Sequence, residues 1–292
     1  QSDLISAKKK CFCQALDHLY DIDLHCLEYI PTSTIRDQVL VTISLLTSIA
    51  LLNLGHMEFQ QSKFDESSHF YHQCLDHLKA SRTNQRDKYM EALFYSSYIM
   101  AACLNCIGIA LLKKEITDKG DEAHDVIQTK VETSLEYFEA SITLYDECSL
   151  NGDVLDDSSS FNANMATAFN NLGRVYFIMD NYEQSLEYYQ VCLNLRLLSL
   201  PPNHLDISVS YFNMGQALQA LGQEGDVEEM LEHYLTFLAI AAPVLGCADE
   251  NIVKAVVVVA DIHASLGNYL EAESILQEYL AASSFASPKS LK

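Results

Sequence analysis

Residues 168–195, AFNNLGRVYFIMDNYEQSLEYYQVCLNL, predict two amphipathic helices joined by a short turn. Apolar and small residues recur three or four positions apart on both sides of the turn, as they do along one face of a helix. Two such helices cannot bury their facing stripes alone, so each pair has to stack on a neighbouring pair. The positions that carry this pattern are Phe169, Leu172, Gly173 and Tyr176 in the first helix and Tyr182, Ser185, Tyr189 and Cys192 in the second.

The same pattern recurs along the chain. Gly215 follows Gly173 by 42 residues, and Ala260 takes the equivalent place 45 residues further on. Earlier copies surround Gly55 and, in a split form, Gly108. Self-similarity at this period predicts an all-α fold, an α-solenoid of about five stacked antiparallel helix pairs. We expect each glycine to admit an aromatic side chain of the second helix, namely Tyr71, Phe138, Tyr189 and Tyr234.

The chain is expected to form one array, because a solenoid grows by addition of units. Residues 1–30 carry an apolar pattern that predicts a helical cap or a half repeat before the array at 31–282. Within the array, we expect an irregular insert at 113–130 and a surface loop at 149–162. The tail at 283–292 has the composition of a disordered segment.

These units resemble tetratricopeptide repeats over Leu51–Leu280. From Met165 to Leu280 the resemblance is to the long repeats of kinesin light chains, because CLNLRLLSLPPNHLDIS at 192–208 is similar to the connection that joins their units. Arg196, Leu200, His204 and Asp206 stand at the matching places, whereas the next connection keeps only Val244, Leu245 and Gly246. The resemblance implies a binding scaffold with a concave groove lined by the first helices.

In this family an asparagine before the glycine commonly hydrogen-bonds the backbone of an extended peptide. An amide offers a donor and an acceptor, so it pairs with peptide N–H and C=O whatever the ligand's side chains. The alternative interpretation is that these asparagines bond within the array and join adjacent repeats. The resemblance places the peptide-binding groove at Asn53, Asn171 and Asn213, with His56, Arg174 and Gln216 one turn along and Asn170 and Phe212 adjacent.

The formal net charge of −22 indicates which classes of partner the chain can bind. Between residues 131 and 250 there are 19 acids and two bases, Arg174 and Arg196. Nucleic acid and anionic membrane are disfavoured, since both require basic protein surface. A clamp for the acidic C-terminus of heat-shock chaperones is rejected, and a neutral or basic peptide or protein partner is predicted. Alternatively, the acids only form a solvated outer face, as expected for Glu183, Glu187, Glu228, Glu229 and Glu232 early in second helices.

No motif for catalysis is present: there is no phosphate-binding loop, nucleophile elbow, H-E-x-x-H or dinucleotide fingerprint. The C-x-x-C pair of Cys103 and Cys106 has no second pair, so structural packing is the preferred interpretation. His69, His72 and His77 are interpreted as surface histidines of one helix. We therefore expect a protein that is not an enzyme and has no cofactor or metal site.

Nine irregularly spaced cysteines, no signal-peptide layout and no 18-residue apolar run free of polar residues predict a soluble cytoplasmic protein. Gln1 stands where an initiator methionine is expected, which suggests a fragment. The predicted function is that of an adaptor that holds a partner peptide in its groove. The alternatives are a sensor domain that controls a fused or bound effector and self-association through the terminal repeats.

Overall fold

The computed structural model describes residues 2–25, 33–83, 90–117, 124–150 and 158–286. Within these ranges the chain forms eleven α-helices and no strand. The all-α prediction is confirmed. Contacts group the chain into two compact units, residues 1–156 and 157–292.

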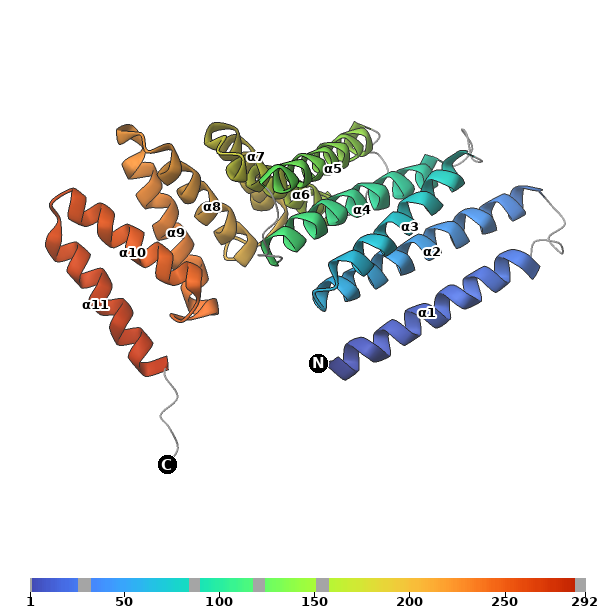
Figure 1. Cartoon of the computed structure of the whole chain (residues 1–292), viewed down its shortest axis with the longest axis horizontal. Helices are drawn as coiled ribbons and strands as arrows, with labels where there is room; N and C mark the ends of the chain where they lie inside the picture. Colours follow the sequence, from blue (N-terminus) through green and yellow to red (C-terminus); the bar gives the residue numbers. More distant parts are fainter. Residues whose placement is uncertain (1, 26–32, 84–89, 118–123, 151–157, 287–292) are drawn as a thin grey trace, which may run out of the picture. The chain divides into compact units, whose positions relative to one another are not determined.

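The first unit is built from helices that pack in pairs (Figure 1). Helix α2 pairs with α3, and α4 pairs with α5, while α3 also packs on α4. Helix α1 packs on α2. The bounds are α1 Ser2–His25, α2 Ser33–Gln60, α3 Phe64–Thr83, α4 Met90–Thr117 and α5 His124–Leu150.

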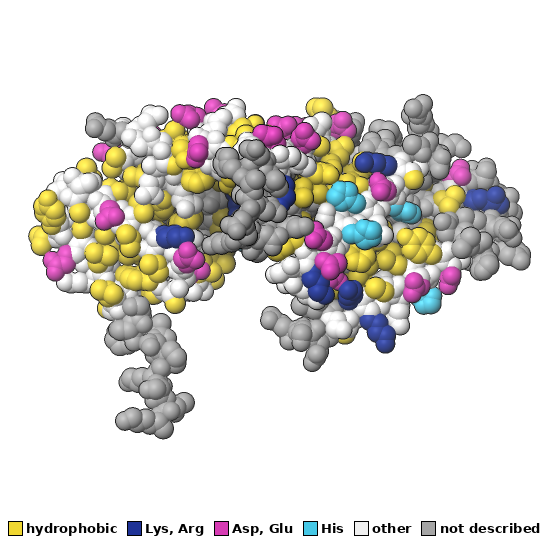
Figure 2. Space-filling view, viewed as in Figure 1, with side chains coloured by type: hydrophobic (Ala, Val, Ile, Leu, Met, Phe, Trp, Pro, Cys, Tyr) yellow, Lys and Arg dark blue, Asp and Glu magenta, His cyan; other side chains and the backbone are white. Residues whose placement is uncertain are grey.

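The second unit contains three further pairs, in which α6 packs on α7, α8 on α9 and α10 on α11. Helices α7 and α8, and α9 and α10, join these pairs. Hydrophobic side chains of α10 and α11 remain at the surface (Figure 2). The bounds are α6 Ser158–Ile178, α7 Tyr182–Ser199, α8 Leu205–Leu221, η2 Glu224–Asp226, α9 Val227–Leu245, α10 Glu250–Ser265 and α11 Tyr269–Ala286.

The turns of the second unit follow from residues that suit helix ends. Asn181 caps α7 by accepting a hydrogen bond from the backbone N–H of Gln184. Asp249 caps α10 in the same way through the backbone N–H groups of Asn251 and Ile252. Gly222 ends α8 with φ +65°, a left-handed conformation that glycine adopts without strain.

The expected contacts between glycines and aromatic rings are confirmed. A Cβ atom added to Gly55 would overlap the ring of Tyr71, and one added to Gly108 would lie 2.7 Å from Phe138. The equivalent distances are 2.7 Å for Gly173 with Tyr189 and 3.0 Å for Gly215 with Tyr234. All four rings are buried. The aromatic ring therefore occupies the space that a side chain would take at Gly55, Gly108 and Gly173, and fits closely at Gly215.

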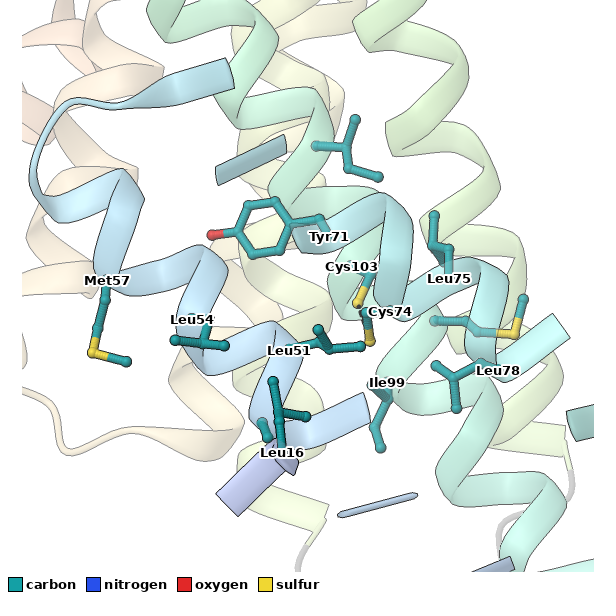
Figure 3. Packing of buried hydrophobic residues seen from close by; sticks show 13 residues of the cluster. Leu16, Leu51, Leu54, Met57, Tyr71, Cys74, Leu75, Leu78, Ile99 and Cys103 are labelled. Carbon is teal, nitrogen blue, oxygen red and sulfur yellow. Dashed lines mark hydrogen bonds between the residues drawn. The ribbon is translucent and has the colours of Figure 1, made fainter. Parts of the chain in front are cut away.

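The core of the first unit contains side chains from α1, α2, α3 and α4 (Figure 3). Leu16 of α1 lies in one cluster with Leu54, Tyr71 and Leu78. Cys74 and Cys103 belong to it as well, and the two Sγ atoms are 3.2 Å apart. The contact with Cys74 and burial together raise the pKa of the Cys103 thiol well above its ordinary value. The Cys103 thiol is thus protonated and packed in the core, which confirms its structural interpretation.

A buried guanidinium joins two repeats of the second unit. Arg196, near the end of α7, is only 6% exposed. Its Nη1 donates to the backbone oxygen of Asp206 at 2.6 Å and to Ser210 Oγ at 2.8 Å, both on α8. His204 precedes α8 and accepts from the backbone N–H of Asp206 at 3.1 Å. Arg196, His204 and Asp206 thus fix the connection between α7 and α8.

Helices extend further than the sequence pattern indicates. Helix α4 continues to Thr117 and α5 begins at His124, so much of the segment 113–130 is helical. Helix α5 ends at Leu150 and α6 begins at Ser158, so both ends of the segment predicted as a loop at 149–162 are helical. Helix α11 extends to Ala286, into the tail predicted to be disordered at 283–292. A helix already anchored by packing continues through polar residues until a breaker occurs.

Two helices of the first unit are long and apolar enough to cross a membrane by length and composition. They are Arg36–Gln60 in α2 and Phe94–Lys113 in α4, of which half or more is buried in the structure. Burial on neighbouring helices gives the central helices of an array the same composition. The expectation that the protein does not bind membranes stays a prediction.

Candidate peptide-binding surface

The predicted groove residues of the second unit come from the first helices of two adjacent repeats. Helix α6 carries Asn170, Asn171 and Arg174, and α8 carries Asn213 and Gln216. All five side chains are partly exposed. The repeat geometry therefore presents their polar groups on neighbouring helices of one unit.

A hydrogen bond connects the two helices on this surface. Asn213 Nδ2 donates to Asn170 Oδ1 at 2.9 Å. This contact agrees with the alternative interpretation for Asn213, that asparagines join adjacent repeats. One such bond uses only part of an amide's capacity, which comprises two N–H donors and an oxygen with two lone pairs. The pair is thus both a link between repeats and a fixed polar group at a partly exposed surface.

The expectation for Phe212 is corrected by the structure. Its side chain is 6% exposed and packs against Tyr234 and Phe237, with ring centroids 5.9 Å and 4.8 Å away. Phe212 occupies the place in its repeat that Asn170 occupies in the preceding one. A large apolar ring at this place turns into the core, where its burial is favourable. Phe212 therefore belongs to the core and offers a ligand little surface.

In the first unit, the predicted residues lie on α2 and contact their own unit. Asn53 Nδ2 donates to the backbone oxygen of Ile49 at 2.8 Å. His56 Nε2 lies 3.3 Å from Cys106 Sγ of α4, and its ring meets Tyr71 edge-on at 5.6 Å. Partial burial lowers the pKa of His56, so the imidazole is neutral at pH 7. Asn53 and His56 thus hold their positions through contacts with α2, α3 and α4.

The register identifies two further residues that the asparagine pattern missed. Cys106 stands two residues before Gly108, the place of Asn171 before Gly173. Asn105 stands at the place of Asn170 and is 6% exposed. Both residues could have been identified from the sequence, because they stand three and two residues before the glycine of their repeat. The asparagine series is therefore interrupted at Cys106.

Acidic side chains lie on the second helices of the second unit. Arg174 is the sole cation on α6 and α8. The prediction that five glutamates of α7 and α9 face solvent is confirmed, because Glu183, Glu187, Glu228, Glu229 and Glu232 are all exposed. Acids early in a helix also complement the helix dipole.

A cavity of about 510 Å³ lies beside the turn between α2 and α3. Its buried carboxylate, Glu58, forms ion pairs with Lys9 of α1 and with Lys63, the latter at 3.4 Å. Burial alone would raise the pKa of Glu58, but the two lysines outweigh it and the pKa is lowered. The charges are paired with one another, and the cavity contains neither Asn53 nor His56. We therefore do not assign it to the peptide surface.

In the part of the chain that the structure describes, no three His, Cys, Asp or Glu side chains lie together so that they could hold a metal ion. His72 instead lies 2.8 Å from the backbone oxygen of Ser68 and 3.2 Å from Tyr137 Oη. His69 and His72 are exposed and His77 is partly exposed.

One histidine of α9 should make the second unit sensitive to acid. His233 is 8% exposed. Its ring centroid lies 5.6 Å from that of Tyr211, and its Nε2 lies 3.6 Å from Glu229 Oε1. Burial lowers its pKa below 6.5, although Glu229 and Glu232 act in the opposite direction. Because the unfolded chain then takes up the proton first, stability should fall as the pH drops below about 6.5, by up to about 1 kcal/mol per pH unit.

Urea denaturation of the wild type and of His233→Phe between pH 5 and 8 measures this effect. The variant should lose part of the dependence, whereas a substitution of the exposed His69 to Gln should keep it. An unchanged pH dependence in His233→Phe would show that His233 is not responsible.

Residues 164–237 match the family model of the tetratricopeptide repeat. This segment runs from α6 into α9 and contains Asn170, Asn171, Arg174 and Asn213. No curated protein matches the sequence of this chain.

Solved structures resemble the fold of this chain at low sequence identity. BtubC (BKLC) from P. vanneervenii is 12% identical with a TM-score of 0.59, covering 99% of this chain and 94% of that chain. A Podospora anserina putative kinesin light chain with nearly identical TPR-like repeats is 16% identical with a TM-score of 0.54, covering 82% and 97%. The apo form of RapI is 10% identical with a TM-score of 0.55, covering 98% and 78%. At these identities the likeness concerns the fold.

Proposed function

We propose that this chain is a non-catalytic adaptor that binds a partner peptide, because residues 164–237 match the tetratricopeptide repeat and the fold resembles that of kinesin-light-chain-like repeats. The repeat fold is suited to protein–protein interaction, since stacked helix pairs create extended binding surfaces. The proposed surface comprises Asn170, Asn171 and Arg174 of α6 with Asn213 and Gln216 of α8.

The amide pair of Asn170 and Asn213 is the observation that carries this proposal. Its 2.9 Å bond fixes the orientation of both side chains before a ligand arrives. Preorganised polar groups cost less entropy on binding than mobile ones. The neighbouring Asn171 and Gln216 add further amides on the same two helices. Several fixed amides side by side suit the repeated N–H and C=O groups of an extended peptide backbone.

Charge supports a neutral or basic peptide. An acidic peptide would find only Arg174 on α6 and α8, whereas exposed glutamates lie on α7 and α9. Complementary charge mainly accelerates encounter and excludes wrong partners. The same balance argues against nucleic acid as a ligand, which requires basic surface.

We also propose a cytoplasmic location. The described cysteines are all free thiols, and four of them are buried: Cys74, Cys103, Cys148 and Cys192. Free thiols are retained in reducing compartments.

Selection of peptides from a displayed random library, followed by fluorescence-polarisation titration, tests the proposal. We expect neutral or basic peptides to be enriched. The double variant Asn171→Ala/Asn213→Ala should bind them about thirtyfold more weakly, because each of the two lost hydrogen bonds costs about 1 kcal/mol. The control is Asn194→Ala, since Asn194 is an exposed asparagine of α7 bonded only locally to Gln190.

Far-UV circular dichroism separates binding from folding in this experiment. The double variant should keep its helicity, although loss of the bond to Asn170 lowers its stability slightly. Unchanged peptide affinity in a folded double variant, or enrichment of acidic peptides, would contradict the proposal. The asparagines would then act only as links between repeats.

A further inference from the structure

The last described helix pair has an apolar face that we call the α11 end face. It comprises Val253 and Val257 of α10 with Leu276 and Leu280 of α11, which are 36%, 46%, 38% and 62% exposed. Val253 and Val257, and likewise Leu276 and Leu280, are four residues apart and therefore lie on one side of each helix. Figure 2 shows hydrophobic side chains where Figure 1 places these two helices.

The repeat register shows what normally covers such a face. Ser208 and Phe212 of α8 are the equivalents of Val253 and Val257, and Tyr234 of α9 is the equivalent of Leu276. These three residues are buried. Phe212 and Tyr234 share a core cluster with Ile252, Ala255, Val256 and Val259 of α10. The face is thus shaped to receive the first helix of a following repeat, and no described helix takes that place after α11.

We propose that the α11 end face binds an amphipathic helix of a partner protein in the position that the first helix of a following repeat would occupy. The apolar side of this helix would resemble that of α10, where Ile252, Val256 and Val259 recur at spacings of four and three. The face continues an interface that the chain already forms between α8, α9 and α10. A docked helix therefore repeats a packing geometry that the fold already uses.

The charged residues of α10 and α11 indicate which kind of helix would bind this face. The exposed acids of α10 and α11 are Glu250, Asp261, Glu271, Glu273 and Glu278. The one lysine there, Lys254, pairs with Glu250 at 2.8 Å. Lysine or arginine beside the apolar stripe of the partner would complement these carboxylates. Two copies meeting through this face would instead oppose like charges, which argues against a second copy as the occupant.

Two synthetic peptides provide the probes for a binding measurement. The first copies residues 250–265 with Glu250→Lys and Asp261→Lys, and the second keeps the apolar residues but carries glutamate at those two places and at Lys254. Labelled peptide is titrated with the full chain by fluorescence polarisation. The basic peptide should bind, and the acidic peptide should bind at least about tenfold more weakly.

Variants of the full chain then locate the binding site. Val257→Glu/Leu280→Glu should weaken binding of the basic peptide by about tenfold or more, because each places a charge within the apolar contact. The matched control is Leu198→Glu, an equally apolar residue of α7 that is 78% exposed. Asn171→Ala/Asn213→Ala should leave this affinity unchanged, so failure here and failure of the proposed groove are distinguishable.

Three results would overturn the proposal. The first is equal affinity for the basic and acidic peptides or no binding of the basic one. The second is wild-type affinity in a folded Val257→Glu/Leu280→Glu variant. The third is concentration-dependent dimerisation of the wild type in sedimentation equilibrium that this variant abolishes, because the face would then serve self-association.

Discussion

Replacing Arg196 by methionine should lower the free energy of unfolding of the second unit by about 3 kcal/mol. The guanidinium is almost fully buried and donates to the Asp206 carbonyl and to Ser210 Oγ. Methionine fills a similar volume but donates no hydrogen bond. It therefore removes both hydrogen bonds by which the guanidinium joins α7 to α8, and leaves Ser210 Oγ at 3.3 Å as the side-chain donor to the Asp206 carbonyl. Hydrogen bonds from a charged donor contribute more than neutral ones.

Urea denaturation followed by far-UV circular dichroism measures this loss, since the chain has no tryptophan for fluorescence. Arg174→Met is the matched control, because Arg174 is partly exposed on α6. It should change stability by less than about 1 kcal/mol. Arg196→Lys should rescue little, since one ammonium does not reproduce the planar fork of arginine. Equal effects at Arg196 and Arg174 would show that the link between α7 and α8 is unimportant.

Truncating Phe138 to alanine should cost the first unit about 3–5 kcal/mol. Its ring is fully buried and lies against Gly108, where an added Cβ would approach it to 2.7 Å. The large ring and the absent side chain are therefore complementary. Removal of the ring leaves a cavity whose walls collapse only in part.

The same complementarity predicts a reversal of sign in a double-mutant cycle. Gly108→Val alone should destabilise by about 1–3 kcal/mol, because the new side chain overlaps the ring. In the Phe138→Ala background, Gly108→Val should be neutral or stabilising, since it partly fills the cavity. Denaturation of the four proteins measures the coupling. Additive losses would mean that the two residues do not share one space.

The glycine–aromatic contacts could be predicted from sequence because both partners recur at fixed places in every repeat. Gly173 and Tyr189 belong to one helix pair, and the helical period alone brings them together. The ends of α4 and α5 were less predictable. Polar residues at 113–117 continue a helix whose stability comes from packing elsewhere, which no local pattern reveals.

The helices that carry the candidate site residues were predictable, whereas the contacts of these residues were less so. Asn170 and Asn213 were placed on first helices correctly, but their mutual bond depends on the offset between α6 and α8. Phe212 shows the opposite limit. Its place in the repeat matches that of Asn170, which is partly exposed, and that of Asn105, which is as buried as Phe212 at 6%. Period determines which face a residue occupies, while the packing of neighbouring helices determines how far its side chain is buried.

The buried thiols give each unit its own reporter of opening motions. Cys148 and Cys103 lie in the first unit, and Cys192 is fully buried in the second. Burial raises the pKa of Cys192, and an inaccessible protonated thiol reacts with iodoacetamide only when its surroundings open. The exposed Cys11 should react at once and calibrates the reagent. Rates of alkylation, read by peptide mass spectrometry, would give the opening free energy of each unit separately in the unmodified sequence.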